Sequence, residues 1–188
     1  MPAFIALLRG VNVGGAKRVP MADWRALMAE LGYTRVATLL NSGNAVFHAT
    51  GSASAGATKK HAAAIADGLA RRLKVEVPVI VKSAGELDAI VAGNTLAQAA
   101  AEDPAFDPSR LLVAFAPDAA VLAGLAPVAA LVLPPEQFVI GPHAAYLHCA
   151  GGILESKAGE ALLGKAGRAA TTRNWATTLK LHALVGAA

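Results

Sequence analysis

The chain of 188 residues is long enough for one large domain or two small ones, with a core that needs no covalent staples. Its single cysteine, Cys149, excludes an internal disulfide and fits a reducing compartment. The first residues lack the charged region and the small-residue cleavage site of a signal peptide, and no apolar run approaches the roughly 20 residues that cross a bilayer. We therefore expect a cytoplasmic protein without a membrane segment.

The formal net charge of +4 is spread unevenly along the sequence. Residues 1–22 contain three bases and no acid, residues 83–150 contain one base against seven acids, and residues 151–188 contain five bases against two acids. If the two ends of the chain meet in space, they produce a local positive field beside an acidic middle. Scattered, solvated charge is the alternative.

The first half of the chain alternates between strand and helix patterns. Apolar runs and turn formers predict strands at 3–8, 35–40, 45–48 and 75–81. Apolar residues on one helical face predict helices that begin at Pro20, near His61 and at the capping box Ser83-Ala84-Gly85-Glu86. Pro78 removes a backbone donor from the last strand, which predicts that this strand lies at the edge of its sheet.

The second half repeats this order without visible sequence similarity. Its patterns predict a strand at 110–115, a helix at 118–125, a hairpin of 137–140 with 144–148, and helices at 156–163 and 172–185. Both halves resemble the split βαββαβ unit of ferredoxin-like folds. We predict an α+β protein of two fused ferredoxin-like halves, with antiparallel sheets and helices packed on one face. The N-terminal half is expected at 1–93, a linker at 94–109 and the C-terminal half at 110–188.

Three segments together resemble a known family. They read Leu7-Leu8-Arg9-Gly10-Val11-Asn12-Val13-Gly14-Gly15 with Val19-Pro20-Met21, Asn41-Ser42-Gly43-Asn44-Ala45-Val46-Phe47, and Ala170-Thr171-Thr172-Arg173-Asn174-Trp175. In this order and spacing they are similar to the bacterial family called domain of unknown function 1697, and the resemblance spans nearly the whole chain. Members are similar to ferredoxin-like α+β folds and have no established activity, substrate or cofactor. The resemblance therefore implies a fold and no function.

One segment departs from the family pattern. Many relatives have a stretch similar to Gly-Ile-Gly-Arg-Ser-Lys, whereas this chain has Gly152-Ile153-Leu154-Glu155-Ser156-Lys157. An acid stands where a base is usual, which argues against an anion-binding role for this turn.

The loop at 9–18 is the first candidate site. It combines three glycines with three bases, and such a loop can direct backbone N–H groups at an anion, especially where a helix begins nearby. It is not a P-loop, because Ala16 stands in the place of the lysine, nor a dinucleotide fingerprint, because Asn12 stands in the place of the second glycine. An anion cradle, a tight connection and a loop that contacts a partner are the alternatives.

The turn Asn41-Ser42-Gly43-Asn44 is the second candidate. Its ordinary interpretation is a hairpin turn in which asparagine accepts a positive φ. If the turn lies beside the first loop, Ser42 and the two asparagines could supply neutral donors to a ligand.

The segment Thr171-Thr172-Arg173-Asn174-Trp175 is the third candidate, and we expect it to start the last helix with a threonine cap. Arg173 in the first turn would oppose the helix dipole by about 0.3–1 kcal/mol. A base at an unfavourable helix end suggests an acidic partner, which is either an internal salt bridge or an anionic ligand.

Catalysis has little support in the sequence. The five histidines show no metal-ligand spacing, and adjacent His148 and Cys149 would face opposite ways in a strand. His61 and His182 lie in helical apolar stripes, which favours core or boundary positions, and Cys149 is expected to be a small buried hydrophobe. No carboxylate pair lies near the motifs, and no nucleophile elbow surrounds Ser42. We expect no metal and no cofactor, and the sequence argues against an enzyme.

We predict a binding protein for an anionic partner, either a nucleic acid or a phosphorylated metabolite. The candidate ligand-binding residues are Arg9, Asn12, Gly14, Gly15, Lys17, Arg18, Asn41, Ser42, Asn44, Thr172, Arg173 and Asn174. With only 5% aromatic residues, any nucleic-acid binding would rest on phosphates and depend steeply on salt. The alternatives are an enzyme that acts on a small phosphorylated metabolite, and an assembly module whose polar motifs hold the two halves, or the subunits of a homo-oligomer, in register.

Overall fold

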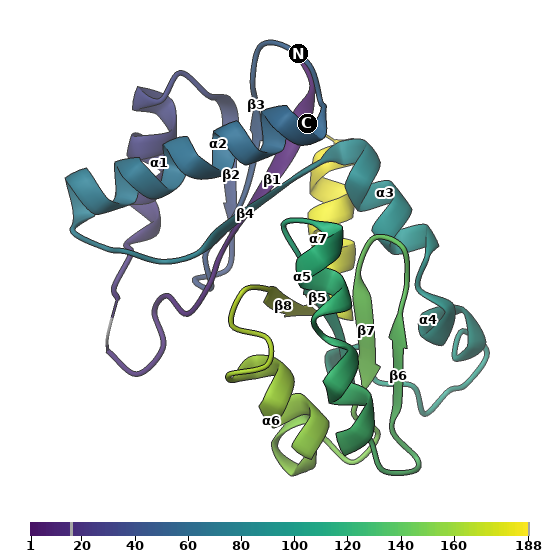
Figure 1. The fold of residues 1–188 in the computed structure, drawn as a ribbon. Helices are drawn as coiled ribbons and strands as arrows, with labels where there is room; N and C mark the ends of the chain where they lie inside the picture. The colour runs from purple at the N-terminus through teal and green to yellow at the C-terminus, as the bar shows by residue number, and fades with distance from the viewer. Residues whose placement is uncertain (16, 188) are drawn as a thin grey trace. The chain divides into compact units, whose positions relative to one another are not determined.

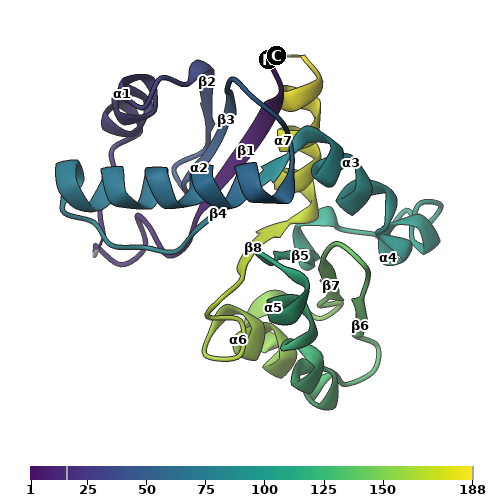
Figure 2. The ribbon, with the colours of Figure 1, turned by 45° about the horizontal axis from the view of Figure 1, so that its top comes forward.

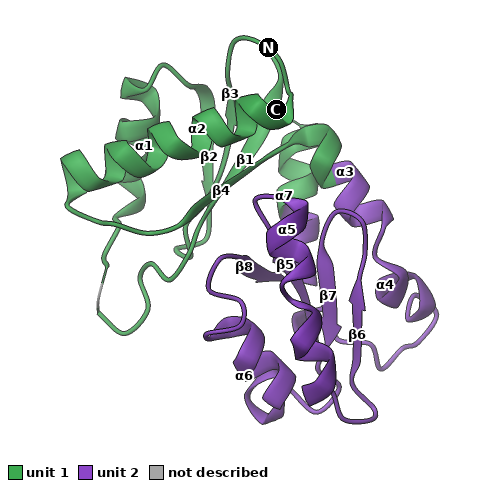
Figure 3. Ribbon diagram, viewed as in Figure 1, with its two compact units in different colours: residues 1–87, 181–188 green, residues 88–180 purple. Residues whose placement is uncertain are grey.

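Two four-stranded antiparallel sheets organise the chain (Figure 1). The structure is a computed structural model that describes residues 1–15 and 17–187. Each sheet belongs to its own unit (Figure 3): unit 1 is formed by residues 1–87 and 181–188, and unit 2 by residues 88–180.

The sheet of unit 1 has the strand order β2-β3-β1-β4, with every neighbouring pair antiparallel. Its strands are β1 (Ala3–Leu8), β2 (Thr34–Leu39), β3 (Asn44–His48) and β4 (Val79–Ser83). Helices α1 (Met21–Glu30) and α2 (Ala55–Gly68) cover one face of the sheet (Figure 2), and α2 continues into a π-helical turn, Leu69–Leu73. This is the predicted βαββαβ unit of a ferredoxin-like half.

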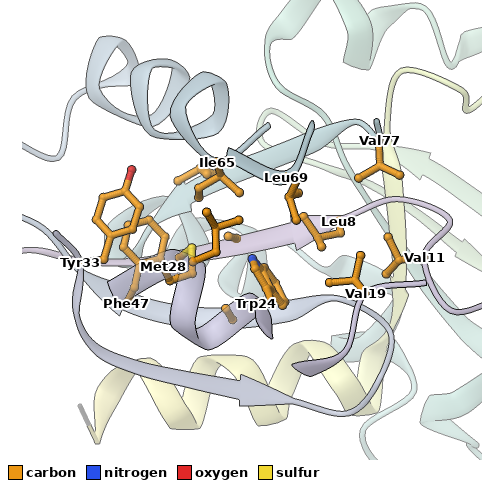
Figure 4. Close-up of a cluster of buried hydrophobic side chains, with 14 of the residues drawn as sticks. Leu8, Val11, Val19, Trp24, Met28, Tyr33, Phe47, Ile65, Leu69 and Val77 are labelled. Carbon is orange, nitrogen blue, oxygen red and sulfur yellow. The ribbon is translucent and has the colours of Figure 1, made fainter. Parts of the chain in front are cut away.

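The core of unit 1 forms because β1 alternates its side chains between the two faces of the sheet. Phe4 and Leu8 pack with Trp24 of α1, Ile65 of α2 and the neighbouring apolar side chains (Figure 4). Ile5, which points to the other face, is also fully buried. Each such large apolar side chain stabilises the fold by about 1.5–3 kcal/mol.

Unit 2 repeats the same arrangement, with the strand order β6-β7-β5-β8. Its strands are β5 (Leu111–Phe115), β6 (Gln137–Ile140), β7 (Ala145–His148) and β8 (Thr171–Asn174), and its core also involves α5 (Ala119–Ala123) and α6 (Lys157–Leu163). β5, β6, β7 and β8 occupy the places that β1, β2, β3 and β4 hold in unit 1. The prediction of two ferredoxin-like halves is therefore confirmed.

The predicted helix at 172–185 is wrong at its start. Residues Thr171–Asn174 form β8, which pairs with β5, and helix α7 (Trp175–Gly186) begins only after them. The cap is not a threonine: Oδ1 of Asn174 accepts a hydrogen bond from the amide of Thr177 at 2.9 Å. β-branched threonines suit a strand, and the ladder with β5 decides the conformation of this short polar segment. β8 is the fourth strand that the sequence analysis did not find in the second half.

Smaller differences concern the segment around β4. The strand begins at Val79 and not at residue 75, although it is an edge strand, as predicted from Pro78. The predicted capping box is present at α3 (Ala84–Ala92), where the Ser83 amide donates to Oε2 of Glu86 at 2.8 Å and the Glu86 amide donates to Oγ of Ser83 at 3.2 Å. The expected linker at 94–109 contains α4 (Thr95–Ala99), and the two units divide after residue 87.

Candidate functional site

Residues 9–19 form a loop of unusual backbone conformation between β1 and α1. Five of its described residues have a positive φ: Gly10 (65°), Asn12 (58°), Gly14 (63°), Gly15 (79°) and Lys17 (52°). The left-handed conformation is strained for Lys17, which has a Cβ, and less so for Asn12, because asparagine adopts it more readily than most residues. Such strain persists only where surrounding contacts hold the chain in place.

Asn12 supplies those contacts. Its Nδ2 donates to the carbonyl oxygens of Val19 at 2.9 Å and Asn41 at 2.7 Å, and its Oδ1 accepts from the amide of Val19 at 2.8 Å. Its own amide donates to the carbonyl oxygen of Lys17 at 3.2 Å. Because both Nδ2 hydrogens are used within the protein, Asn12 closes the loop and fixes its shape.

The hairpin turn between β2 and β3 lies beside this loop, as the functional interpretation of the turn required. The amide of Leu8 donates to the carbonyl oxygen of Gly43 at 2.8 Å. Asn44 is completely buried, and its Nδ2 donates to the carbonyl oxygen of Leu39 at 3.0 Å and to Oγ of Ser42 at 2.9 Å. In this turn the positive φ is adopted by Leu40 (58°) and Gly43 (80°) and by neither asparagine.

A pocket of about 410 Å³ opens where the loop, the turn and the start of α1 meet. Its lining residues are Asn12, Gly15, Arg18, Val19, Pro20, Met21 and Asn41, and none of them is acidic. Pro20 precedes the helix and provides no side-chain cap. The first hydrogen bond within α1 runs from the amide of Trp24 to the carbonyl oxygen of Pro20. The N–H groups of the first turn therefore have no acceptor within the helix.

Arg18 is the charged side chain of this pocket. It is exposed, and it makes no hydrogen bond or ion pair with any residue that the structure describes. It also borders a second open depression, of about 560 Å³, that Lys17, Lys74 and Glu76 help to line. Lys17 crosses this depression, since its Nζ donates to the carbonyl oxygen of Glu76 at 3.0 Å.

The remaining residues of the loop and the neighbouring chain complete the site. Arg9 is half-buried, and burial lowers the pKa of its guanidinium from its ordinary value. Its amide donates to the carbonyl oxygen of Pro78 at 3.1 Å. Sequence reasoning missed Lys74, because the approach of the segment after α2 to the loop is a tertiary contact. The sequence could have indicated Met21 as a residue of the site, since the loop runs directly into α1, which has no side-chain cap.

Thr172, Arg173 and Asn174 belong to unit 2 and have a different setting from the one expected. Arg173 lies in β8, so the argument from the dipole of a first helical turn does not apply to it. Its Nη1 donates to Oγ1 of Thr171 at 3.0 Å and to the carbonyl oxygen of Thr172 at 2.8 Å. Asn174 uses its side-chain oxygen to cap α7.

Among the residues that the structure describes, no group of three His, Cys, Asp or Glu side chains is arranged to hold a metal ion. Cys149 is fully buried, as predicted, and burial raises the pKa of its thiol. Within the same described ranges, no helix combines the length and apolarity of a transmembrane span.

The fold and the loop define the class of this protein: it has two fused ferredoxin-like halves, and the N-terminal half presents a basic glycine-rich loop. The chain belongs to the family described as protein of unknown function (DUF1697), whose model matches residues 1–146. It is similar over 98% of both chains to the solved structure of the conserved bacterial protein SP0830 from Streptococcus pneumoniae, with a TM-score of 0.77 and 22% sequence identity. At this identity the likeness shows the fold alone. No curated protein matches the chain.

Proposed function

We propose that this protein binds a phosphorylated small molecule and holds the phosphate between Arg18 and the N-terminus of α1. One observation carries the proposal: the same pocket is lined by a guanidinium that has no partner among the described residues and by the start of a helix that has no side-chain cap. Asn12 and Asn41 hold the loop against the turn, so the pocket walls are fixed before a ligand arrives.

The start of α1 and Arg18 each favour an anion, and for independent reasons. A helix N-terminus offers several N–H donors and about half a positive charge. A guanidinium presents paired donors that match two oxygens of a phosphate. Asp23 in the first turn of α1 is exposed and does not line the pocket, so it leaves this side open to an anion.

The charge distribution supports the same ligand. Unit 1 contains eleven Lys and Arg against five Asp and Glu, whereas unit 2 contains six against eight. An anion is therefore drawn towards the unit that carries the pocket.

The size and surroundings of the pocket favour a small molecule over a nucleic acid. A volume of about 410 Å³ lies in the range of small-molecule sites. The large exposed hydrophobic side chains of the loop and the turn are aliphatic, Val13 (70% exposed) and Leu40 (53% exposed), and neither offers a ring on which a base could stack. Catalysis on such a ligand, homo-oligomer assembly and a cytoplasmic location stay predictions from the sequence.

Calorimetric titration at low ionic strength tests the proposal. The panel contains inorganic phosphate, sugar phosphates, nucleotides and single-stranded oligonucleotides. We expect saturable binding of a phosphorylated small molecule that Arg18→Gln weakens by about tenfold or more, because the charge-assisted bonds are lost.

Arg35→Gln is the matched control. Arg35 is also an exposed arginine of unit 1 and lines neither depression beside the loop, so its removal changes the net charge equally and should leave the affinity within about twofold. Equal losses in both variants would show non-specific attraction and contradict the proposal. Binding of oligonucleotides alone would replace the small molecule by a nucleic acid.

A further inference from the structure

A separate pocket of about 520 Å³ lies in unit 1, where the chain that leaves β3 enters α2. It is lined by residues of three segments: Leu31, Gly32 and Tyr33 after α1; Ala49, Thr50, Gly51, Ser52 and Ser54 after β3; and Gly56, Ala57, Lys60, His61 and Ala64 of α2. None of these residues lines the pocket at Arg18, so the two pockets are independent.

The imidazole of His61 is held in one orientation at this pocket. Its ring meets three aromatic rings nearly edge-on, with centroid distances of 4.9 Å to Phe4, 5.3 Å to Tyr33 and 5.8 Å to Phe47. Its Nδ1 lies 3.0 Å from the hydroxyl oxygen of Tyr33. Figure 4 shows the Tyr33 ring at the margin of the buried cluster, with the hydroxyl directed out of it.

The contact with the Tyr33 hydroxyl bears on the position of the histidine proton. Tyr33 is only 8% exposed, and burial raises the pKa of its phenol, so the hydroxyl keeps its hydrogen at neutral pH. Nδ1 of His61 is its one hydrogen-bond partner among the described residues, and a hydroxyl that donates there requires an Nδ1 without a proton. A neutral imidazole that accepts at Nδ1 carries its proton on Nε2. Burial, followed by the charge of Lys60, lowers the pKa of His61 and keeps the ring neutral.

The other polar groups of the pocket are suited to the same kind of ligand. Lys60 contributes an exposed ammonium group, and Thr50 and Ser52 contribute hydroxyls. None of the lining residues is acidic. A pocket that combines a cation, an N–H donor and hydroxyls without a carboxylate matches a ligand that bears an oxyanion.

We propose that this pocket binds the carboxylate or phosphate group of a second small molecule, to which Nε2 of His61 and Nζ of Lys60 donate hydrogen bonds. Tyr33 is a positioning residue, because it acts on the ligand only through the tautomer of His61. The inference does not depend on the site at Arg18.

Nuclear magnetic resonance on the full ¹⁵N-labelled chain tests this proposal in two steps. The ring nitrogens of His61 at pH 7.5 report the tautomer, which we expect to be protonated at Nε2. Titration with inorganic phosphate and, separately, with acetate should then shift Nε2 of His61 and the amides of Gly56 and Ala57 along a saturable curve. The stronger of the two probes identifies the class of anion.

Two variants and two controls locate the binding. Lys60→Gln changes an exposed side chain and should weaken the binding of the stronger probe about three- to tenfold, and Tyr33→Phe should release the tautomer and weaken binding by a similar factor. Arg25→Gln and Arg35→Gln remove the same charge outside both pockets and should leave the curve unchanged. A proton on Nδ1, the lack of saturable shifts with both probes, or equal losses in all four variants would overturn the proposal.

Discussion

Asn12 shows at the scale of one residue how a side chain that looks like a ligand can instead build a site. A polar residue among glycines in an exposed loop suggests a donor to a ligand, and sequence reasoning could not assign the three hydrogen bonds that its side chain makes within the protein. Two of its acceptors lie on residues 19 and 41, so only the folded chain brings them together.

Replacement of Asn12 tests this role. We expect Asn12→Ala to lower the free energy of unfolding by about 1–2 kcal/mol, at the lower end for three hydrogen bonds because the residue is exposed and water can take their place. Asn12→Gly loses the same bonds but accepts a φ of 58° without a Cβ, and should recover up to about 1 kcal/mol. Urea denaturation measures both. Equal stabilities would show that backbone strain is not part of the cost.

Gly43 is required for close packing in the turn. A Cβ at this position would lie 2.7 Å from Cβ of Leu8 and 2.8 Å from Cγ2 of Val11, at a φ of 80°. Because core atoms must move, we expect Gly43→Ala to cost more than about 3 kcal/mol. Gly10→Ala is the matched control: its φ is 65°, but no atom lies within 4 Å of its Cβ, so it should cost about 1–2 kcal/mol. Comparable midpoints in urea for the two variants would contradict the steric argument.

His61 gives unit 1 a defined dependence on pH. Burial lowers its pKa in the folded state below the ordinary 6.5, so between these two values the unfolded chain binds more protons than the folded chain. Stability is therefore lost as the pH falls from about 6.5 towards the folded pKa. In His61→Gln this contribution disappears, while the other four histidines titrate in both proteins. We expect the stability difference between wild type and variant to shrink between pH 7.5 and pH 5.5; a constant difference would contradict the pKa shift.

At the scale of elements, the residues before α7 show that pairing with a distant strand can override what the local sequence favours. The segment Thr171–Asn174 contains residues that cap helices and residues that favour strands, and it lies directly before a helix. Its pairing with β5, with Val113 opposite Arg173, determines that it is a strand.

The position of the cap follows from this boundary and can be measured. Asn174→Ala removes the acceptor for the amide of Thr177 and should cost about 1 kcal/mol. Thr172→Ala, at one of the two threonines that the sequence offered as the cap, should cost less, because this side chain caps no helix in the structure. Chemical denaturation of the two variants distinguishes a helix that begins at Trp175 from one that begins at residue 172. A larger loss of stability in Thr172→Ala than in Asn174→Ala would favour the start at residue 172.

At the scale of the whole molecule, the chain leaves unit 1 after residue 87 and returns to it at residue 181. The last turns of α7 thus belong to the unit that carries both proposed binding pockets. Leu181, the first residue of this returning segment, is fully buried. The C-terminal segment is therefore a structural part of unit 1 and not an appendage.

Two leucines of α7 test this assignment. Leu181→Ala removes a buried side chain and should lower the free energy of unfolding by about 2–5 kcal/mol. Leu179, two residues earlier, is 40% exposed, and Leu179→Ala should cost less than half as much. Thermal or urea unfolding gives both values. Similar losses would mean that burial at residue 181 contributes little to stability.

The sequence by itself determined most of the periodic elements, the capping box at Ser83, the edge position of β4, the ferredoxin-like order of the first half, the similar course of the second half up to residue 170, and the family. These features depend on residues that are close to one another in the sequence. The alternation of side chains, a helix cap and a proline without a backbone N–H all act within a few residues. Only the tertiary structure decided that Thr171–Asn174 is a strand, that loop 9–19 meets the turn at Asn41, and that Tyr33 orients His61. Each of these depends on partners 28 or more residues apart in the sequence, which the chain brings together only when it folds.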